Sequence, residues 1–128
     1  MRLLDTDVMV DILRAFPQAI EWLASLGNEE LVLPGFVVLE LLDGCSTKRE
    51  TKQLQKRIQV FRIHWPKEED CNRALADFAH FHLSHHLSMM DALIAECAIG
   101  LDCSLCTFNQ KHFKPLVNLS TEQPYSRR

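Results

Sequence analysis

The sequence predicts an α/β fold in which a mainly parallel sheet is covered by helices on both faces. Short apolar segments such as Leu31–Leu33 alternate with longer segments whose apolar residues recur at helical spacing. These short segments are continuously apolar, as in strands that are buried on both sides. The length of 128 residues, with 47% hydrophobic and 24% charged residues, fits one globular domain.

The first half of the chain is expected to supply two of the strands. Leu3–Leu4 forms the first, and Asp5 or Thr6 caps a helix that follows it. Pro17 starts a second helix, which stops at Gly27. The next expected elements are a strand at Leu31–Leu33, a turn at Pro34–Gly35, a largely buried helix over Phe36–Cys45 that ends near Gly44, and a basic helix from Thr47 to Arg57.

The second half continues the alternation. Its expected elements are a strand within Ile58–His64 that includes Val60, a helix opened by Glu68-Glu69-Asp70, a helix over Met89–Ile99 closed by Gly100, a strand at Ser104–Thr107 and a last strand at Val117–Leu119. Residues 1–120 are therefore expected to form one domain, and residues 121–128 a loose polar tail. Parallel sheets place their sites beyond the carboxyl ends of the strands, so we look for chemistry there.

The charge balance of 14 basic and 17 acidic residues argues against a globally basic nucleic-acid binder. One segment, residues 48–57, is strongly basic, and Lys48, Lys52 and Lys56 share a face if it is helical. This face is either a solvated outer surface or a strip that contacts RNA phosphates. No apolar segment is long enough to span a membrane. The acidic Asp5 so near the start also does not fit the apolar central region of a signal peptide, so we expect a cytoplasmic protein.

The cysteines, histidines and tryptophans have structural interpretations. An odd number of cysteines, 5, favours reduced thiols, and the pair Cys103 and Cys106 lies in an expected strand rather than a redox motif. The cluster His80–His86 is interpreted as a helix end and surface loop, although His82 and His86 are spaced as a metal pair would be on a helix. Trp22 and Trp65 are interpreted as packing residues rather than base-stacking platforms.

Three carboxylates lie among apolar neighbours: Asp5 after the first strand, Glu40 inside the Phe36–Cys45 helix, and Asp91 in the Met89–Ile99 helix. No basic residue lies within five positions of Glu40 or Asp91, so a local ion pair is not available to either. Carboxylates that converge without cations raise each other's pKa. A divalent metal relieves this repulsion, and oxygen ligands suit Mg²⁺ or Mn²⁺ in phosphoryl-transfer chemistry.

Four segments occur in order along nearly the whole chain: Leu4-Asp5-Thr6-Asp7, Val37-Val38-Leu39-Glu40-Leu41, Asp91-Ala92-Leu93-Ile94-Ala95, and Thr107-Phe108-Asn109-Gln110-Lys111-His112-Phe113. Together they resemble the PIN domain, and more closely the VapC-type toxin ribonucleases of toxin–antitoxin pairs. The last two segments are fairly specific in combination, whereas any one segment alone is a weak signal. The resemblance implies a three-layer α/β/α sandwich with a central, mainly parallel sheet of four or five strands.

The resemblance also implies a function: a metal-dependent endoribonuclease toxin of a type II toxin–antitoxin pair, using Mg²⁺ or Mn²⁺. By position, Asp5, Glu40 and Asp91 match the family's acidic metal ligands, and Asn109 falls at the fourth catalytic position. The supporting positions are Thr6, Thr107 and Asp7, and the RNA-contacting candidates are Lys48, Lys52 and Lys56. The implied partners are RNA, a cognate antitoxin and a second copy of the chain.

Three other interpretations stay open from the sequence. Asp5-Thr6-Asp7 imitates the start of haloacid-dehalogenase-like phosphatases, although Met9 and the lone Asp91 depart from their pattern. Lys114-Pro115 imitates a receiver-like signalling domain, which needs an acid where this chain has His64. A degenerate, non-catalytic PIN-like binding module is the third, because Asn109 replaces an acid.

Overall fold

A computed structural model describes residues 1–128 and contains a five-stranded, fully parallel sheet. The strands are β1 (Arg2–Leu4), β2 (Leu31–Pro34), β3 (Arg62–His64), β4 (Ser104–Cys106) and β5 (Thr121–Glu122), in the spatial order β3-β2-β1-β4-β5. The helices are α1 (Thr6–Leu13), α2 (Pro17–Ser25), α3 (Gly35–Asp43), α4 (Lys48–Ile58), α5 (Glu68–His85), α6 (Met89–Leu101) and the 3₁₀ helix η1 (Gln110–Phe113). The predicted α/β/α sandwich with a parallel sheet is confirmed.

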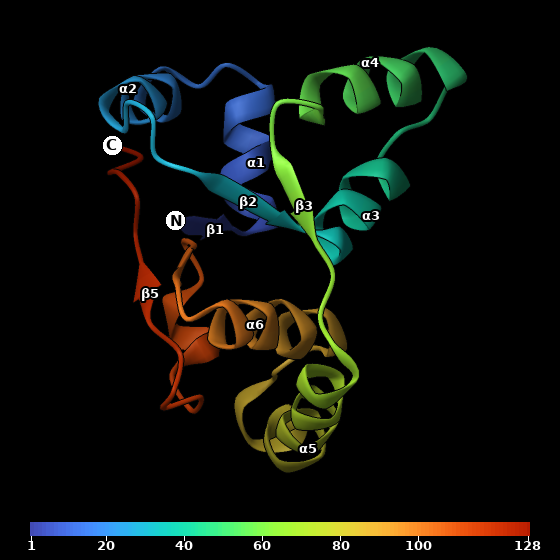
Figure 1. Ribbon diagram of the computed structural model, residues 1–128, viewed down its shortest axis with the longest axis vertical. Coiled ribbons are helices and arrows are strands. Elements are labelled where there is room, and N and C mark those ends of the chain that lie inside the picture. The colour runs from blue at the N-terminus through green and yellow to red at the C-terminus, as the bar shows by residue number, and fades with distance from the viewer.

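The helices form a layer on each face of the sheet. Figure 1 shows α1, α2 and α4 on one side of the strands and α5 and α6 on the other, with α3 next to the end of β2. The chain moves from β1 outward to β3, then crosses the other face through α5 and α6 and returns beside β1 as β4. The direction of winding therefore reverses between β1 and β4, which is where open parallel sheets bind ligands.

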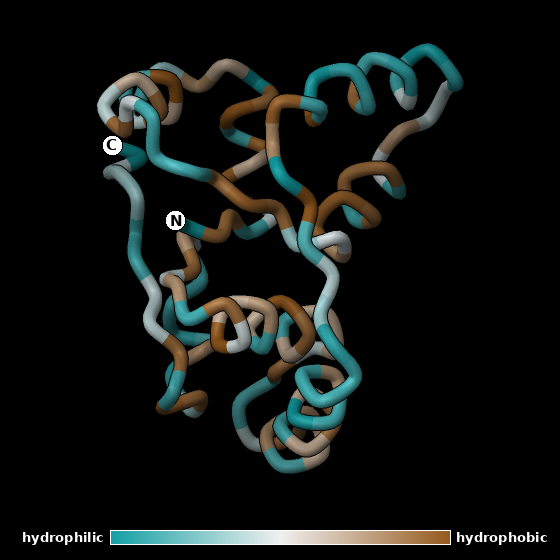
Figure 2. The backbone as a smooth tube through the Cα atoms, viewed as in Figure 1, coloured by the Kyte–Doolittle hydropathy of each residue, from teal (hydrophilic) through white to brown (hydrophobic).

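The core explains why such short strands hold together. Leu3, Leu33 and Leu105 are fully buried on neighbouring strands, and Figure 2 shows the hydrophobic centre of the sheet. Helix α6 packs against it with small residues, Ala95 and Ala98, both fully buried. Each apolar side chain that is removed from water contributes roughly 1.5–3 kcal/mol to the stability of the fold. The helices packed on both faces of the sheet therefore compensate for the small number of hydrogen bonds that such short strands can form.

Three expectations about boundaries were wrong. Val60 is 84% exposed in a turn, because the chain must turn after Ile58 before β3 begins. Helix α6 continues through Gly100 and ends at Asp102 in the left-handed conformation. Gly100 lies inside the helix, at a position where the side chain of Asp70 occupies the space that a Cβ would need. Helix α5 runs on to His85, one turn into the expected loop.

The last strand is not Val117–Leu119, and the tail is not loose. Val117 is 89% exposed, and its segment forms turns after η1. The polar residues Thr121 and Glu122 form β5 instead, since an edge strand needs only backbone groups and Thr107 N–H donates to the Glu122 carbonyl at 3.0 Å. Tyr125 then packs near Trp22, at 6.0 Å between ring centroids.

The remaining structural interpretations are mostly confirmed. All cysteines are free thiols, and Cys97 and Cys106 are buried in the core. Trp22 is partly buried against the core, while Trp65 is 54% exposed and covers Gly35 beside Phe36. No helix combines the length and apolar character required to cross a lipid bilayer.

Candidate active site

Asp5 lies at the carboxyl end of the central strand and is 5% exposed. Its backbone N–H donates to the Cys106 carbonyl at 3.0 Å, so the carboxyl group is fixed by the β1–β4 pairing. The side chain caps α1 by accepting from Thr6 N–H at 2.8 Å, and its other oxygen accepts from the Thr107 hydroxyl at 2.7 Å. Asp5 therefore serves both as the N-cap of α1 and as a residue of the candidate site.

Burial raises the pKa of Asp5 to about 7, and repulsion from Asp7 and Asp91 adds to the effect. The hydrogen bonds from Thr107 and Thr6 N–H oppose this shift because they stabilise the ionised form. A carboxyl group with this pKa is half protonated at neutral pH unless a cation approaches it. A cation bound beside Asp5 would favour its ionised form.

Asp7 joins the start of α1 to the loop after β4. Its two carboxylate oxygens accept from Val8 N–H at 2.8 Å and from Phe108 N–H at 2.9 Å. Burial raises the pKa of Asp7, while these two bonds and the charge of Arg127 lower it. Asp7 therefore holds the loop that carries Thr107 and Phe108 against α1.

Glu40 enters the site from α3 through Thr6. The Thr6 hydroxyl donates to Glu40 Oε1 at 2.7 Å, while the Thr6 backbone N–H bonds to Asp5. Thr6 therefore links the two acids. The apolar neighbours of Glu40 were expected to surround it, but Val38 and Leu41 face the core while Glu40 itself is exposed on the site side of the helix.

Asp91 is the third residue of α6 and is half-buried. Its backbone N–H donates to the Ser88 hydroxyl at 3.0 Å, which caps the helix and fixes where the acid emerges. Its negative charge adds to the rise in the pKa of Asp5, although burial of Asp5 and repulsion from Asp7 contribute more. A carboxylate in the first turn is also favoured by the helix dipole.

Asn109 follows β4 and begins η1. Its backbone N–H donates to the Thr107 hydroxyl at 3.1 Å, so Thr107 accepts from Asn109 while it donates to Asp5. The amide side chain of Asn109 is exposed and available to a ligand. Thr107 is completely buried and connects the two loop ends of the site.

The site has the donor chemistry for a divalent cation but is open. No group of three or more His, Cys, Asp or Glu side chains is placed closely enough to enclose a metal ion. None of the ion pairs of the chain includes Asp5, Glu40 or Asp91. Uncompensated carboxylates and few protein ligands fit Mg²⁺, which keeps several waters and binds through one or two carboxylates plus substrate oxygens.

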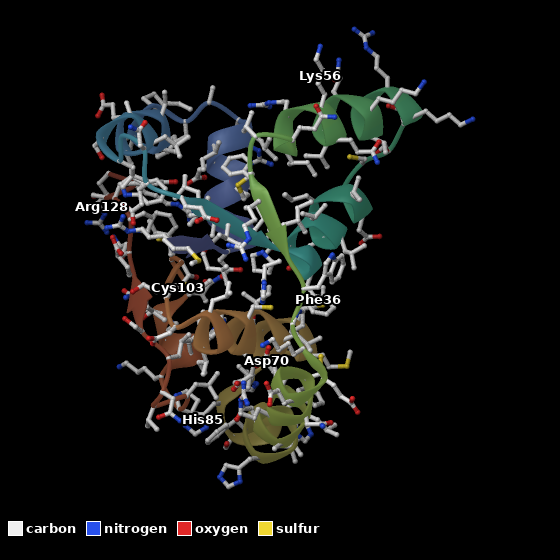
Figure 3. The ribbon with its side chains drawn as sticks, viewed as in Figure 1. Phe36, Lys56, Asp70, His85, Cys103 and Arg128 are labelled. Carbon is white, nitrogen blue, oxygen red and sulfur yellow. The ribbon has the colours of Figure 1, made fainter.

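A groove of about 650 Å³ opens beside Thr6 and Glu40, between α1, α3 and α4. Apolar side chains form its floor, including Leu13, Leu41 and Leu54, and Arg14, Glu50, Lys56 and Arg57 line its sides. Lys48 and Lys52 line a separate hollow at the start of α4. Figure 2 shows the strongly hydrophilic character of α4, and Figure 3 shows Lys56 on this helix, so the basic face is only partly directed to the groove.

The histidine cluster does not join the site. His82 lies in α5, and its ring contacts the Phe78 carbonyl and stacks on the Phe78 ring. His86 follows the helix end with a positive φ of 55°, so the two residues do not form the spaced helical pair that metal binding requires. The interpretation of this cluster as structural is favoured, although more of it is helical than expected.

Two contributors to the site were not anticipated. Ser88 stands three residues before Asp91, and the pattern of a hydroxyl residue followed by an acid at this spacing predicts a helix cap. Arg127 reaches the site from the tail, where the sequence carries no local signal of it. Its position depends on the docking of β5 and Tyr125, which is a long-range event.

Comparisons with known proteins agree with this geometry. The model of the PIN domain family matches residues 2–116. Ribonuclease VapC19 of Mycobacterium tuberculosis is 35% identical and covers 98% of this chain and 100% of its own. The chain is similar in structure to VapBC2 from Rickettsia felis bound to a promoter DNA fragment (TM-score 0.71, 26% identity, coverage 94% and 96%) and to a toxin–antitoxin complex from Klebsiella pneumoniae (TM-score 0.78, 19% identity, coverage 98% and 99%).

Proposed function

Because the chain belongs to the PIN domain family, we propose that it is the toxin of a toxin–antitoxin pair and acts as a metal-dependent endoribonuclease. The observation that supports the proposal is the buried Asp5 at the carboxyl end of β1, which is linked through Thr6 to Glu40 and forms no ion pair with a cationic side chain. The ribonuclease name of a relative that is similar over its full length supports the same activity. We place its action in the cytoplasm, where RNA is available.

In this proposal Asp5 and Asp91 hold Mg²⁺ or Mn²⁺ and Glu40 completes the set of acids. When bound, the cation lowers the pKa of a water and offsets negative charge on the phosphate. Thr107 and Thr6 keep the carboxylate oxygens oriented through the bonds described above. Asn109 orients water or the RNA with its exposed amide. No side chain needs to act as a covalent nucleophile, and the products carry 5′-phosphate and 3′-hydroxyl ends.

The groove beside Glu40 is the proposed binding site of the antitoxin. Its apolar floor and its charged rim suit an amphipathic segment of a partner protein, which would block access to Glu40 and Thr6. We also propose a homodimer, because Leu75 and Met89 on α5 and α6 are 68% and 65% exposed beside an apolar hollow. Sedimentation velocity of the purified chain measures this association.

The decisive experiment is cleavage of purified RNA by the wild-type protein and by Asp91→Asn. The wild type is expected to release fragments with 5′-phosphate ends in Mg²⁺ or Mn²⁺ and to be inactive in EDTA. Asp91→Asn is expected to reduce the rate by at least about 100-fold, since a ligand carboxylate is lost while the helix cap from Ser88 remains.

Asp102→Asn is the matched control. It removes the same charge from the other end of α6, at a left-handed position that Asn tolerates well. It is expected to cleave at the wild-type rate. Full activity of a folded Asp91→Asn protein contradicts the assignment of the site, and an inactive wild type with every RNA and metal tested favours a non-catalytic binding module.

A further inference from the structure

The C-terminal residues place a positively charged side chain, that of Arg127, at the edge of the acidic site. After β5, the Tyr125 hydroxyl donates to Asp11 Oδ2 at 2.7 Å, and Arg127 Nε donates to the same oxygen at 3.0 Å. These bonds hold the end of the chain to α1. Figure 1 shows the C-terminus beside α2, and Arg128 is labelled there in Figure 3. The tail is part of the folded domain.

The Arg127 guanidinium lies over the ring of Phe108 in the site loop. Its central carbon is 3.9 Å from the centroid of the Phe108 ring, and the Phe108 backbone N–H is bonded to Asp7. Phe108 stands between Thr107 and Asn109, so the guanidinium is one residue away from both along the loop. Stacking on an aromatic ring fixes the plane of an arginine without using its N–H groups.

Most of the hydrogen-bonding capacity of Arg127 is unused. A guanidinium has five N–H donors, and only Nε is engaged, with Asp11. The side chain is 45% exposed, so both terminal nitrogens can receive a ligand. The Tyr125 hydroxyl already anchors the tail to Asp11. The positive charge of Arg127 is not needed for this anchoring and is therefore available for another role.

We propose that Arg127 binds a phosphate of the RNA next to the cleaved bond, on the Asp7 side of the site. This inference rests on the proposed ribonuclease function and adds a substrate-binding residue to it. An RNA backbone that approaches Asp5, Asp7 and Asp91 is repelled, so cations must hold the flanking phosphates. Arg14 and Arg57 line the groove beside Glu40, and Arg127, which is not part of that groove, supplies positive charge beside Phe108 and Asp7.

The test measures RNA binding in a background that does not cleave. Asp91→Asn protein, in Mg²⁺, is titrated against a fluorescein-labelled single-stranded RNA of mixed sequence at a series of KCl concentrations. Adding Arg127→Gln is expected to weaken binding roughly tenfold, which is the loss of one charge-assisted contact. The slope of log affinity against log salt is expected to become shallower by about 0.7, the value of one phosphate contact on a single strand.

Three variants in the same background separate phosphate binding from a structural role. Arg62→Gln removes the same charge from β3, on the opposite edge of the sheet, where Arg62 pairs with Glu30 at 2.9 Å. It is expected to leave the slope unchanged. Tyr125→Phe removes the other bond to Asp11 and is also expected to leave the slope unchanged. Arg127→Lys keeps the charge and is expected to keep the slope with weaker binding.

The outcomes distinguish this inference from the function on which it rests. If Arg127→Gln changes the slope no more than Arg62→Gln does, Arg127 does not contact phosphate and the inference is wrong. If Tyr125→Phe lowers the slope as much as Arg127→Gln, the tail acts through structure and the inference is also wrong. If the wild type cleaves no RNA and the Asp91→Asn protein binds none, the ribonuclease proposal itself fails. Thermal unfolding of each variant verifies that it is folded.

Discussion

The Thr107 hydroxyl donates a 2.7 Å hydrogen bond to Asp5 Oδ2, joining residues that are 102 positions apart. The two side chains follow β4 and β1, whose last residues, Cys106 and Leu4, are paired in register. Parallel pairing therefore places the hydroxyl directly beside the carboxylate. This relationship connects the topology of the sheet to the chemistry of the site.

Replacement of Thr107 by Val is expected to disturb both the fold and the site. The variant leaves the Asn109 N–H without its acceptor and removes a bond that lowers the pKa of Asp5. We expect a loss of roughly 1–3 kcal/mol in the free energy of unfolding, measured by urea denaturation. The pH profile of RNA cleavage should shift to higher pH. Thr107→Ser keeps the hydroxyl, and a shift of the same size in that variant would contradict this explanation.

The metal-free protein is expected to lose stability as pH rises from about 4 to about 7. The pKa of Asp5 is raised to about 7, so between these values the folded chain retains a proton that the unfolded chain has released. Protonation therefore favours the folded state, and each such group contributes a slope of up to about 1.4 kcal/mol per pH unit. Asp5→Asn should remove one part of this slope in urea denaturation at several pH values.

Glu96 provides a second, separable part of the same slope. It is buried in α6, and burial together with a hydrogen bond to Asp77 raises its pKa to about 7, opposed by the bond from Arg73. Glu96→Gln should reduce the slope independently of Asp5→Asn, because the residues share no hydrogen bond. Unchanged slopes in both variants would show that neither acid retains its proton in the folded state.

Metal binding is expected to strengthen as pH rises through 7, since protons and cations compete for Asp5. Calorimetric titration with Mn²⁺ at pH 6 and pH 8 should give an affinity roughly tenfold higher at pH 8, with fewer protons released there. Asp5→Asn should bind Mn²⁺ weakly at both pH values. An affinity that is independent of pH would exclude Asp5 as the group that gives up a proton to the metal.

Gly100→Ala is expected to destabilise the protein although Ala is the better helix former. A Cβ at Gly100 would stand 2.7 Å from Asp70 Oδ1, and Asp70 is held by Arg73 and by the Lys67 N–H at 2.9 Å. The expected cost is roughly 1–3 kcal/mol, as in other overpacked sites. Figure 3 shows Asp70 between α5 and α6.

Gly44→Ala is the matched control for this substitution. Its Cβ would meet no atom closer than 3.4 Å, and φ is −77° at this position. Urea denaturation should therefore show no loss of stability, or a gain of up to about 1 kcal/mol from reduced freedom of the unfolded chain. Equal losses in the two variants would mean that contact with Asp70 is not the cause.

The sequence predicts the central part of the fold because its strands are buried and its helices have local start signals. Leu31–Leu33 and the cap at Asp5 are such cases, and both are confirmed. Prediction from the local sequence fails where a strand forms only through backbone hydrogen bonds to its neighbour. Thr121–Glu122 is such a strand, because it has no apolar side chains. Local prediction also fails at Gly100, because this glycine makes room for Asp70 of another helix and does not mark the helix end.

The site could be anticipated in its acids but not in its connections. The sequence points to Asp5 and Asp91 because carboxylates among apolar neighbours need an explanation and because their segments resemble those of the PIN domain. The bonds that orient them involve Thr107 and Ser88, of which only the latter is local. Arg127 could not be anticipated, because its place depends on the tail docking against Asp11 across 116 positions.

The position of β1 in the middle of the sheet determines when the site can exist during synthesis. β1 leaves the ribosome before its neighbour β4, because the residues that follow the two strands, Asp5 and Thr107, are 102 positions apart in the chain. Until then Asp5 lacks its hydroxyl partner, and one edge of the central strand is open. The Asp5–Thr107 bond, and with it this part of the site, is therefore completed only after β4 has been made.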